Sequence, residues 1–128
     1  SNAKYWNSKL KKYEEFFILP ITNQKYKNTF LSYPLTVKKN PFFTKNELVN
    51  YLEKKGIETR PVMAGNIVEQ PVTKMLDYKV VGNLKNSEFI MRNSFLIGNH
   101  QGIKKQQREY VLESIVEFVE NKLGKKQS

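Results

Sequence analysis

The spacing of hydrophobic positions changes several times along the chain, and each change marks the boundary of an expected element. Residues 4–18 are polar and rich in lysine, but their apolar side chains recur at near-helical spacing until Pro20 ends the segment. The run NTFLSYPLTVK, residues 28–38, predicts a strand because strand-forming side chains recur in it. Pro34 within that run indicates an edge position or a bulge, since proline cannot donate a ladder hydrogen bond.

A capping box predicts that a second helix starts at Thr44. The threonine hydroxyl and the carboxylate of Glu47 can each satisfy a free backbone donor in the first turn. Phe43 and Leu48 stand where a hydrophobic staple forms. Gly56 suits a left-handed stop at the other end of this helix.

The second half of the chain predicts shorter elements and one long helix. The expected elements are a strand at 57–60, a helical turn at 70–76 with Pro71 near its start, a short helix at 86–92, a strand at 94–98 and a final helix from about Lys104 to just before Gly124. The final helix carries a core-facing stripe formed by Tyr110, Val111, Ser114, Ile115, Phe118 and Val119. This order favours an α+β fold, with helices packed on one face of a small antiparallel or mixed sheet.

Composition narrows the possible classes of protein. The chain has 128 residues, of which 39% are hydrophobic, and this suits one compact domain. Nothing in it approaches the roughly eighteen consecutive apolar residues of a membrane-spanning helix, and no signal peptide is evident. The sequence has no cysteine, which excludes disulfides and thiolate metal sites, and we expect a cytoplasmic location. The first three residues, Ser1 to Ala3, have the form of an expression-tag remnant.

The charge is strongly basic, with 22 Lys and Arg against 12 Asp and Glu, a formal net charge of +10. An excess of this size attracts polyanions such as nucleic acid, a membrane surface or phosphate-bearing small molecules. The alternative is a lysine-rich, solvated surface. Only three of the 22 basic residues are arginine, the side chain that specific phosphate and base readers prefer.

The run IETRPVMAGN holds the best candidate for ligand binding. Arg60 is followed by proline, which restricts its backbone to extended geometry at the end of the expected strand. Gly65 allows an unusual backbone angle, and Asn66 offers both a donor and an acceptor. Such a loop can hold phosphate or sugar hydroxyls. The alternative is a surface ion pair of the arginine with Glu58 or Glu69.

The only histidine, His100, lies in the run GNHQG. Gly98 and Gly102 permit a tight turn and the close approach of a ligand to the backbone. A lone histidine without acidic neighbours at ligand spacing predicts no metal site. The sequence also lacks the turn of a serine hydrolase and the glycine-rich loop of a nucleotide phosphate site. The histidine is either a polar turn residue or a ligand contact.

Several ordered runs together resemble a known family. They are GIETRPVMAGN from Gly56, QP at 70–71, VGNLKN from Val81 and FLIGNH from Phe95, preceded by SYPLTVK. Over about residues 14–120 they resemble the C-terminal part of the DegT/DnrJ/StrS family of PLP-dependent sugar aminotransferases. Within that family the runs look like those of the nucleotide-sugar 3-dehydratases.

The resemblance implies a fold and a domain organisation. Residues 4–124 are expected to form the C-terminal small domain of a fold-type I PLP-dependent transferase, between a tag remnant at 1–3 and a frayed lysine-rich tail at 125–128. The cofactor, PLP or PMP, is then held by a large domain upstream, together with the Schiff-base lysine or the histidine that replaces it. His100 falls in a different motif from that histidine. These residues are accordingly expected to contain no catalytic residue and no metal ligand, and to be inactive alone.

The resemblance also implies a function in deoxysugar or lipopolysaccharide biosynthesis. The substrate is expected to be a nucleotide-linked 4-keto-6-deoxyhexose, contacted by Arg60, Asn66 and His100, and the parent is expected to be a homodimer. Two alternatives remain, a small basic nucleic-acid-binding module and a purely structural dimerisation domain. The nucleic-acid alternative rests on the charge and on fifteen Tyr and Phe residues, but no arginine-rich cluster supports it.

Overall fold

The computed structural model describes residues 1–21, 23, 25, 26 and 28–127, with side chains described as far as Gly124. Three-residue or five-residue 3-10 turns are labelled η. The elements are α1 (Asn2–Leu10), η1 (Lys11–Tyr13), β1 (Phe17–Ile18), β2 (Ser32–Val37), α2 (Lys45–Lys54), β3 (Thr59–Pro61), η2 (Ile67–Glu69), η3 (Pro71–Met75), α3 (Lys85–Asn93), β4 (Ser94–Gly98) and α4 (Lys105–Gln127). From β2 onward, every element that the hydrophobic pattern predicts is present, although some of their ends are shifted.

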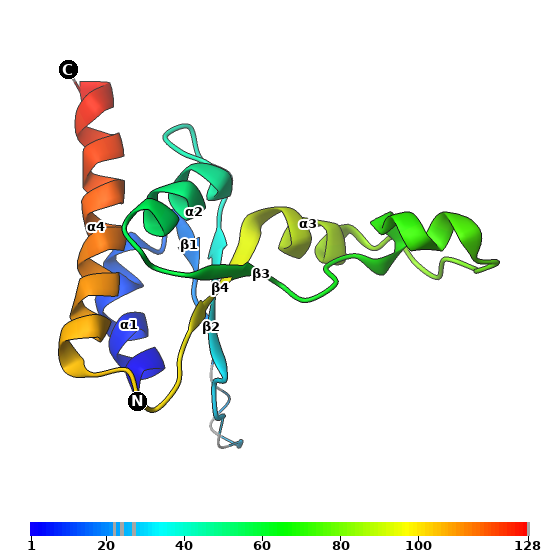
Figure 1. Ribbon diagram of the computed structural model, residues 1–128. Helices are drawn as coiled ribbons and strands as arrows, with labels where there is room; N and C mark the ends of the chain where they lie inside the picture. Colours follow the sequence, from blue (N-terminus) through cyan, green and yellow to red (C-terminus); the bar gives the residue numbers. More distant parts are fainter. Residues whose placement is uncertain (22, 24, 27, 128) are drawn as a thin grey trace.

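The four strands form one antiparallel sheet in the order β1-β2-β4-β3. The helices α1, α2 and α4 lie together on one side of this sheet, and the segment between β3 and β4 extends from the other side (Figure 1). The prediction of an α+β fold is therefore confirmed, and the sheet is antiparallel rather than mixed. β3, which carries Arg60, is an edge strand.

Alternating burial along β2 shows which face of the sheet is covered. Tyr33, Leu35 and Val37 are buried, whereas the residues between them are only partly buried. The three buried side chains join a core with Leu52 of α2 and Val119 of α4. Burying a side chain of this size contributes roughly 1.5–3 kcal/mol. The helical side of the sheet is therefore where the molecule gains most of its stability.

Trp6 ties the first helix to both the sheet and the last helix. Its ring meets that of Tyr33 edge to face, with 5.1 Å between the centroids. Its indole N–H donates to the backbone oxygen of Arg108, at 3.0 Å. The hydroxyl of Tyr33 donates to Oδ1 of Asn7 at 2.7 Å, and burial raises the pKa of Tyr33 above its ordinary value. These contacts satisfy the polar atoms of two large buried aromatic side chains.

The capping box at the start of α2 is confirmed. The backbone N–H of Glu47 donates to the hydroxyl of Thr44 at 3.3 Å, and the N–H of Thr44 donates to the Glu47 carboxylate at 2.8 Å. Phe43 and Leu48, the expected staple pair, are both buried. Gly56 has a φ of 76°, in the left-handed region that its position after the helix predicts.

The N-terminal segment differs from its prediction. The helix ends at Leu10, a 3-10 turn follows, and Phe17 and Ile18 form the short strand β1 instead of continuing a helix to Pro20. β1 exists because it pairs with the end of β2, a contact between distant residues that helical spacing cannot reveal. α1 begins at Asn2, so two of the three residues assigned to a tag remnant lie in it, and Ala3 is buried.

The final helix also departs from its prediction, at its C-terminal end and at the first residue of its stripe. α4 continues past Gly124 to Gln127, so this glycine does not stop it. Ser114, Ile115, Phe118 and Val119 are buried as expected, but Tyr110 is 46% exposed. The predicted fraying of the tail at 125–128 is not tested, because the side chains of 125–127 and the whole of Ser128 lie outside the described residues.

Pro34 lies within an inner strand, where the sequence indicates an edge or a bulge. It faces Leu96 of β4 on one side. On the other side, β1 pairs only with Thr36 and Val37, so in the described part of the chain no strand lies opposite Pro34 there. The proline is accommodated because β1 is so short.

Candidate functional site

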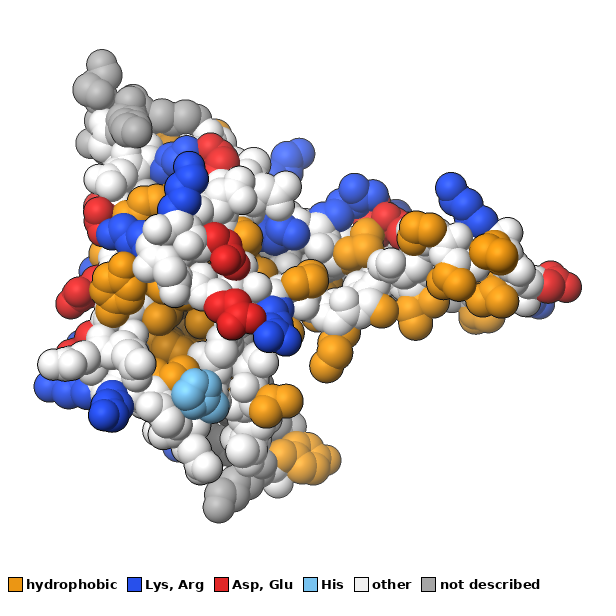
Figure 2. Space-filling view, in the orientation of Figure 1, with side chains coloured by type: hydrophobic (Ala, Val, Ile, Leu, Met, Phe, Trp, Pro, Cys, Tyr) orange, Lys and Arg blue, Asp and Glu red, His pale blue; other side chains and the backbone are white. Residues whose placement is uncertain are grey.

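The run RPVMAGN leads away from the sheet into a projecting segment. We call residues 62–93, which include η2, η3 and α3, the arm. The arm extends from the side of the sheet opposite the other helices (Figure 1). Hydrophobic side chains gather along one edge of it, and lysine and arginine side chains lie along the other edge (Figure 2).

Arg60 sits on β3, on the face of the sheet opposite the main core. It pairs with Leu96, which in turn pairs with Pro34, and directly opposed residues of antiparallel strands point to the same face. Its Nε and Nη2 atoms donate to Oε1 of Glu58 at 2.9 and 2.8 Å. The two side chains are 74% and 73% exposed. An ion pair this exposed contributes about 0–1 kcal/mol, so an anionic ligand can displace the glutamate at low cost.

The start of β3 is fixed to α2 by a carboxylate. Thr59 donates to Oε1 of Glu53 through its hydroxyl at 2.6 Å and through its backbone N–H at 2.7 Å. These two hydrogen bonds, first that of the hydroxyl and then that of the backbone, lower the pKa of the Glu53 carboxyl below its usual value. Arg60 is thus attached to a strand end that a helix holds in place.

Asn66 is buried, with 7% of its surface exposed, and its side-chain N–H donates to Oε1 of Glu69 at 3.3 Å. Gly65 precedes it with a φ of 60°, and a Cβ there would stand 2.5 Å from Cγ of Met91. The side chain of Gln70 donates to the backbone oxygen of Ala64 at 2.7 Å. The polar end of Asn66 therefore helps to hold the base of the arm.

His100 is exposed in the turn that follows β4. Its Nδ1 accepts a hydrogen bond from the backbone N–H of Gly102 at 3.1 Å. In the neutral ring, this bond places the proton on Nε2, which becomes a donor for a ligand. A Cβ at Gly102 would stand 3.0 Å from Nδ1, so the turn needs little bulk at that position.

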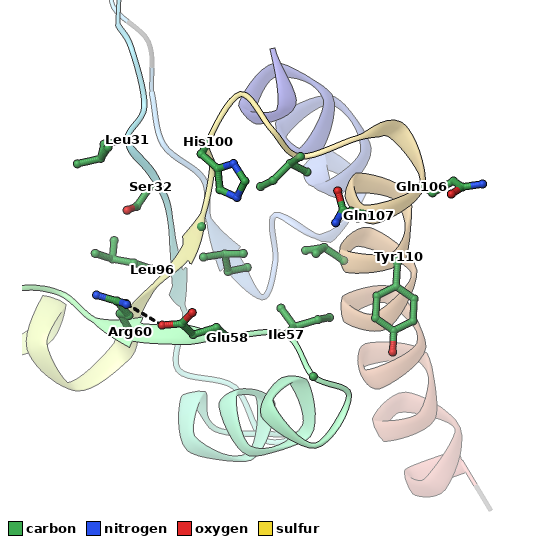
Figure 3. Close-up of a pocket in the computed structure, with 15 residues that line it drawn as sticks. Leu31, Ser32, Ile57, Glu58, Arg60, Leu96, His100, Gln106, Gln107 and Tyr110 are labelled. Carbon is green, nitrogen blue, oxygen red and sulfur yellow. Dashed lines mark hydrogen bonds and ion pairs between the residues drawn. The ribbon is translucent and has the colours of Figure 1, made fainter.

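Arg60 and His100 line the same cleft, of about 750 Å³, and Asn66 does not (Figure 3). The cleft lies between the β3 edge of the sheet and the first turns of α4. Its apolar part is formed by Leu31, Ile57, Leu96, Ile97, Ile103 and Val111, and its other polar lining by Ser32, Glu58, Gln106, Gln107 and Tyr110. The structure therefore brings together two of the three predicted site residues, which are forty positions apart in the sequence.

Four polar lining residues were missed by the sequence analysis: Ser32, Gln106, Gln107 and Tyr110. The position of Gln106 and Gln107, in the first turn of a helix just after the His100 turn, is a signal that could have found them. Tyr110 was expected in the core, but its hydroxyl donates to the backbone oxygen of Lys55 at 3.0 Å, across the end of the cleft. The periodicity of α4 could not show that Tyr110 lies at the cleft, where it remains 46% exposed.

The cleft does not fit PLP. As far as the chain is described, its lining contains no lysine to form a Schiff base and no aspartate to pair with a pyridine nitrogen.

The described residues also contain no group of three His, Asp or Glu side chains able to hold a metal ion. No helix among them is long and apolar enough to span a membrane. The polar groups that the cleft does offer to a ligand are those of Arg60, His100, Ser32, Glu58, Gln106, Gln107 and Tyr110.

The buried aromatic side chains weaken the nucleic-acid alternative. Seven of the fifteen Tyr and Phe residues that the nucleic-acid alternative relies on are buried in the core: Tyr13, Phe16, Phe17, Tyr33, Phe43, Phe95 and Phe118. A single-strand-binding surface needs exposed aromatic rings beside basic groups. These seven rings are therefore not available for stacking with bases.

Comparison with known proteins shows the family of the chain. The sequence matches the DegT/DnrJ/EryC1/StrS aminotransferase family over residues 1–116. The chain belongs to this family. The predicted resemblance is thereby confirmed over nearly the whole sequence.

Curated members of the family are similar to the chain over most of its length. The lipopolysaccharide biosynthesis protein RfbH of Salmonella typhimurium is 33% identical over 118 residues, which are 92% of this chain and 27% of RfbH. The GDP-4-keto-6-deoxy-D-mannose 3-dehydratase of Escherichia coli O55:H7 is 31% identical over 101 residues, 78% of this chain and 25% of that enzyme. The chain spans about a quarter of the length of the curated relatives it matches.

Solved structures of the family share the fold. The E. coli GDP-4-keto-6-deoxy-D-mannose-3-dehydratase with bound hydrated PLP has a TM-score of 0.77 at 28% identity, over 89% of this chain and 29% of that chain. An aminotransferase from Psychrobacter cryohalolentis has a TM-score of 0.81 over 94% of this chain and 33% of its own. Its identity of 10% supports the fold alone. The predicted fold class and the association of the family with PLP are both confirmed.

Proposed function

We propose that the chain is the C-terminal small domain of a PLP- or PMP-dependent enzyme that acts on a nucleotide-linked 4-keto-6-deoxyhexose, either as a 3-dehydratase or as an aminotransferase. The proposal is supported by family membership and by relatives that are named as sugar-nucleotide 3-dehydratases and as a lipopolysaccharide biosynthesis protein. The intact enzyme is then a cytoplasmic homodimer of deoxysugar biosynthesis. Its cofactor is held outside residues 4–124.

The observation that carries the proposal is the shared cleft of Arg60 and His100. A guanidinium group presents a planar pair of donors that matches a phosphate or two adjacent hydroxyls. His100 adds a single N–H donor, and the apolar lining can cover the face of a sugar or base. One ligand in the cleft can thus contact a positive charge, directed hydrogen-bond donors and an apolar surface.

Within this scheme, the chain contributes binding and positioning. PLP supplies the electron sink for breaking bonds to the sugar when it is bound. Arg60 exchanges its glutamate partner for the ligand, and His100 holds a hydroxyl or phosphate oxygen through Nε2. The apolar lining excludes water around the part of the ligand it covers. Asn66 acts on the ligand only through the shape of the arm base.

The test is a titration of the isotopically labelled chain with a GDP-linked 6-deoxyhexose, followed by NMR. We expect chemical-shift changes at β3, at 98–103 and in the first turn of α4. Arg60→Lys should weaken these changes, because lysine lacks the two-point fork. Arg92→Lys is the matched control, since Arg92 is also exposed and paired with glutamates but lies on the arm. Changes confined to other surfaces, or equal loss in both variants, would contradict the proposal.

A further inference from the structure

The ring of Tyr110 lies at one end of the cleft and is held there by its own chain. Its hydroxyl donates to the backbone oxygen of Lys55 at 3.0 Å, and the residue is 46% exposed. A tyrosine whose polar tip is bonded and whose ring is open presents a rigid apolar plane. The contacts proposed above for Arg60 and His100 do not use this ring.

The cleft leaves open space at the same end. Gly56 follows Lys55 directly and lines the cleft, and a Cβ built on it would meet no atom within 4 Å. The apolar side chain of Ile57 lies at this end together with Tyr110 (Figure 3). The whole cleft, of about 750 Å³, falls in the range of roughly 300–1,000 Å³ that holds ligands larger than a single sugar.

Gln107 adds a hydrogen-bond donor whose direction is fixed. The backbone N–H of Lys104 donates to its Oε1 at 2.8 Å, and an amide nitrogen cannot accept such a bond, so the NH₂ group is the free end of the side chain. Gln107 lies three residues before Tyr110, which puts the two on neighbouring positions of one helix face. Figure 3 shows Gln107 turned toward the other labelled residues and Gln106 turned away from them.

A ring plane beside a single donor favours a nucleobase as the ligand at this end. The hydroxyl of Tyr110 and the oxygen of Gln107 are already used by backbone groups, so these two side chains offer a ligand no free acceptor. A sugar hydroxyl both donates and accepts, whereas a carbonyl oxygen or ring nitrogen on the edge of a base only accepts. Proteins commonly hold single bases by stacking on an aromatic ring and hydrogen bonding to the edge.

We propose that the Tyr110 end of the cleft is a subsite for the nucleobase of the sugar nucleotide. The base stacks on the ring of Tyr110, and an acceptor on its edge takes a hydrogen bond from Nε2 of Gln107. The inference rests on the proposed function, which supplies a sugar nucleotide as the ligand, and it adds the residues that bind the base. Arg60 and His100 are then left for the phosphate and the sugar.

The first experiment measures dissociation constants of the 128-residue chain by NMR titration with two probes. One is a GDP-linked 6-deoxyhexose, and the other is the 6-deoxyhexose 1-phosphate, which lacks the base. Tyr110→Leu should raise the dissociation constant of the first probe about tenfold, because the stacking of one base is lost. It should leave that of the second unchanged. Tyr78→Leu is the matched control, since Tyr78 is 50% exposed and lies on the arm. Circular dichroism checks that both variants remain folded.

The second experiment isolates the donor. Gln107→Glu keeps an acceptor for the backbone of Lys104 and removes the NH₂ group, and Gln106→Glu makes the same change of charge one residue away. Gln107→Glu should weaken binding of the GDP-linked probe about threefold or more relative to Gln106→Glu. In the natural chain, the side-chain amide signals of Gln107 should move on binding and those of Gln106 should not. The H8 proton of the guanine should move upfield, because it stacks on a ring.

The outcomes separate this inference from the proposed function. Equal effects of variant and control in either pair overturn the inference, and so does weaker binding of the sugar phosphate to Tyr110→Leu. If Arg60→Lys weakens binding of the GDP-linked probe and Tyr110→Leu does not, the inference fails and the proposed function stands. If neither probe shifts the signals of the cleft, both fail.

Discussion

The body of the molecule and its arm use the same kinds of hydrophobic residue in opposite ways. In the body, Leu48, Leu52 and Val119 are fully buried between the sheet and its helices. On the arm, Met63 and Met75 are 86% and 85% exposed. The difference shows that the body packs its own apolar side chains, whereas those of the arm are left uncovered by the described residues. The cleft of Arg60 and His100 belongs to the body, beside the root of the arm.

The largest expected effect is on the free energy of unfolding, which a substitution in the body should lower far more than one on the arm. Leu52→Ala should lower the free energy of unfolding by about 2–5 kcal/mol, because it leaves a cavity in the core. Met75→Ala should change it by no more than about 0.5 kcal/mol, because its side chain is exposed. Urea melts at concentrations where the chain is monomeric measure both values. Equal changes in the free energy of unfolding would contradict the view that only the side chains of the body are packed in a core.

The next effect concerns catalysis by the intact enzyme. Arg60→Lys should lower kcat/KM by about tenfold or more, because a charge-assisted hydrogen bond is worth about 1.5–3 kcal/mol. The fold should persist, since the side chain is exposed and its ion pair with Glu58 is weak. Steady-state kinetics and a thermal melt check this, with Arg92→Lys as the control. Full activity with a lowered melting temperature would make Arg60 a structural ion-pair partner.

A smaller effect is expected at the capping box. Thr44→Ala should destabilise the body by about 1 kcal/mol, because the first turn of α2 loses its side-chain acceptor. Thr29→Ala, at an exposed position outside any helix, should be neutral. Denaturant melts of both variants provide the measurement. An unchanged midpoint for Thr44→Ala would mean that the hydroxyl contributes nothing measurable to the helix.

The smallest effect is a pH dependence that involves Glu47. Hydrogen bonds from Lys122 and then from the backbone of Thr44 lower the pKa of this carboxyl from 4.5. A lowered folded-state pKa stabilises the protein above the unfolded value and loses that contribution as the pH falls through the folded value. Stability should therefore decline below about pH 4.5 more steeply in the natural chain than in Glu47→Gln. Denaturant melts between pH 6 and pH 3 give the free energy of unfolding of both chains. If it falls equally with pH in both, the exposed pair of Glu47 and Lys122 contributes nothing measurable.

Local chemistry explains which parts of the fold could be predicted from the sequence. The capping box at Thr44, the left-handed Gly56 and the turn that starts at Pro71 each depend on a few adjacent residues, and the structure contains all three. The strand β1 was missed because it consists of two residues that pair with distant ones. Tyr110 was misplaced because a helical period does not reveal which turns of the helix border an open cleft.

The candidate site also depends partly on local sequence and partly on contacts between distant residues. The motif resemblance selects Arg60, Asn66 and His100, but only the pairing of β3 with β4 brings the first and third of them to one cleft. Asn66 has an internal partner because the turn at Gly65 directs it toward Glu69. The open face of the arm could not be predicted, since a hydrophobic pattern does not tell whether its own chain or a partner covers it.

The most direct test of the account is a double-mutant cycle on the two cleft residues in the intact enzyme. The variants are Arg60→Lys, His100→Asn and their combination, with kcat/KM for the sugar nucleotide as the measured quantity. Asparagine keeps an acceptor near Nδ1 and removes the Nε2 donor. If both side chains hold one ligand, their effects should be non-additive by about 0.5 kcal/mol or more. Strictly additive effects, or full activity in either single variant, would contradict a shared ligand in this cleft.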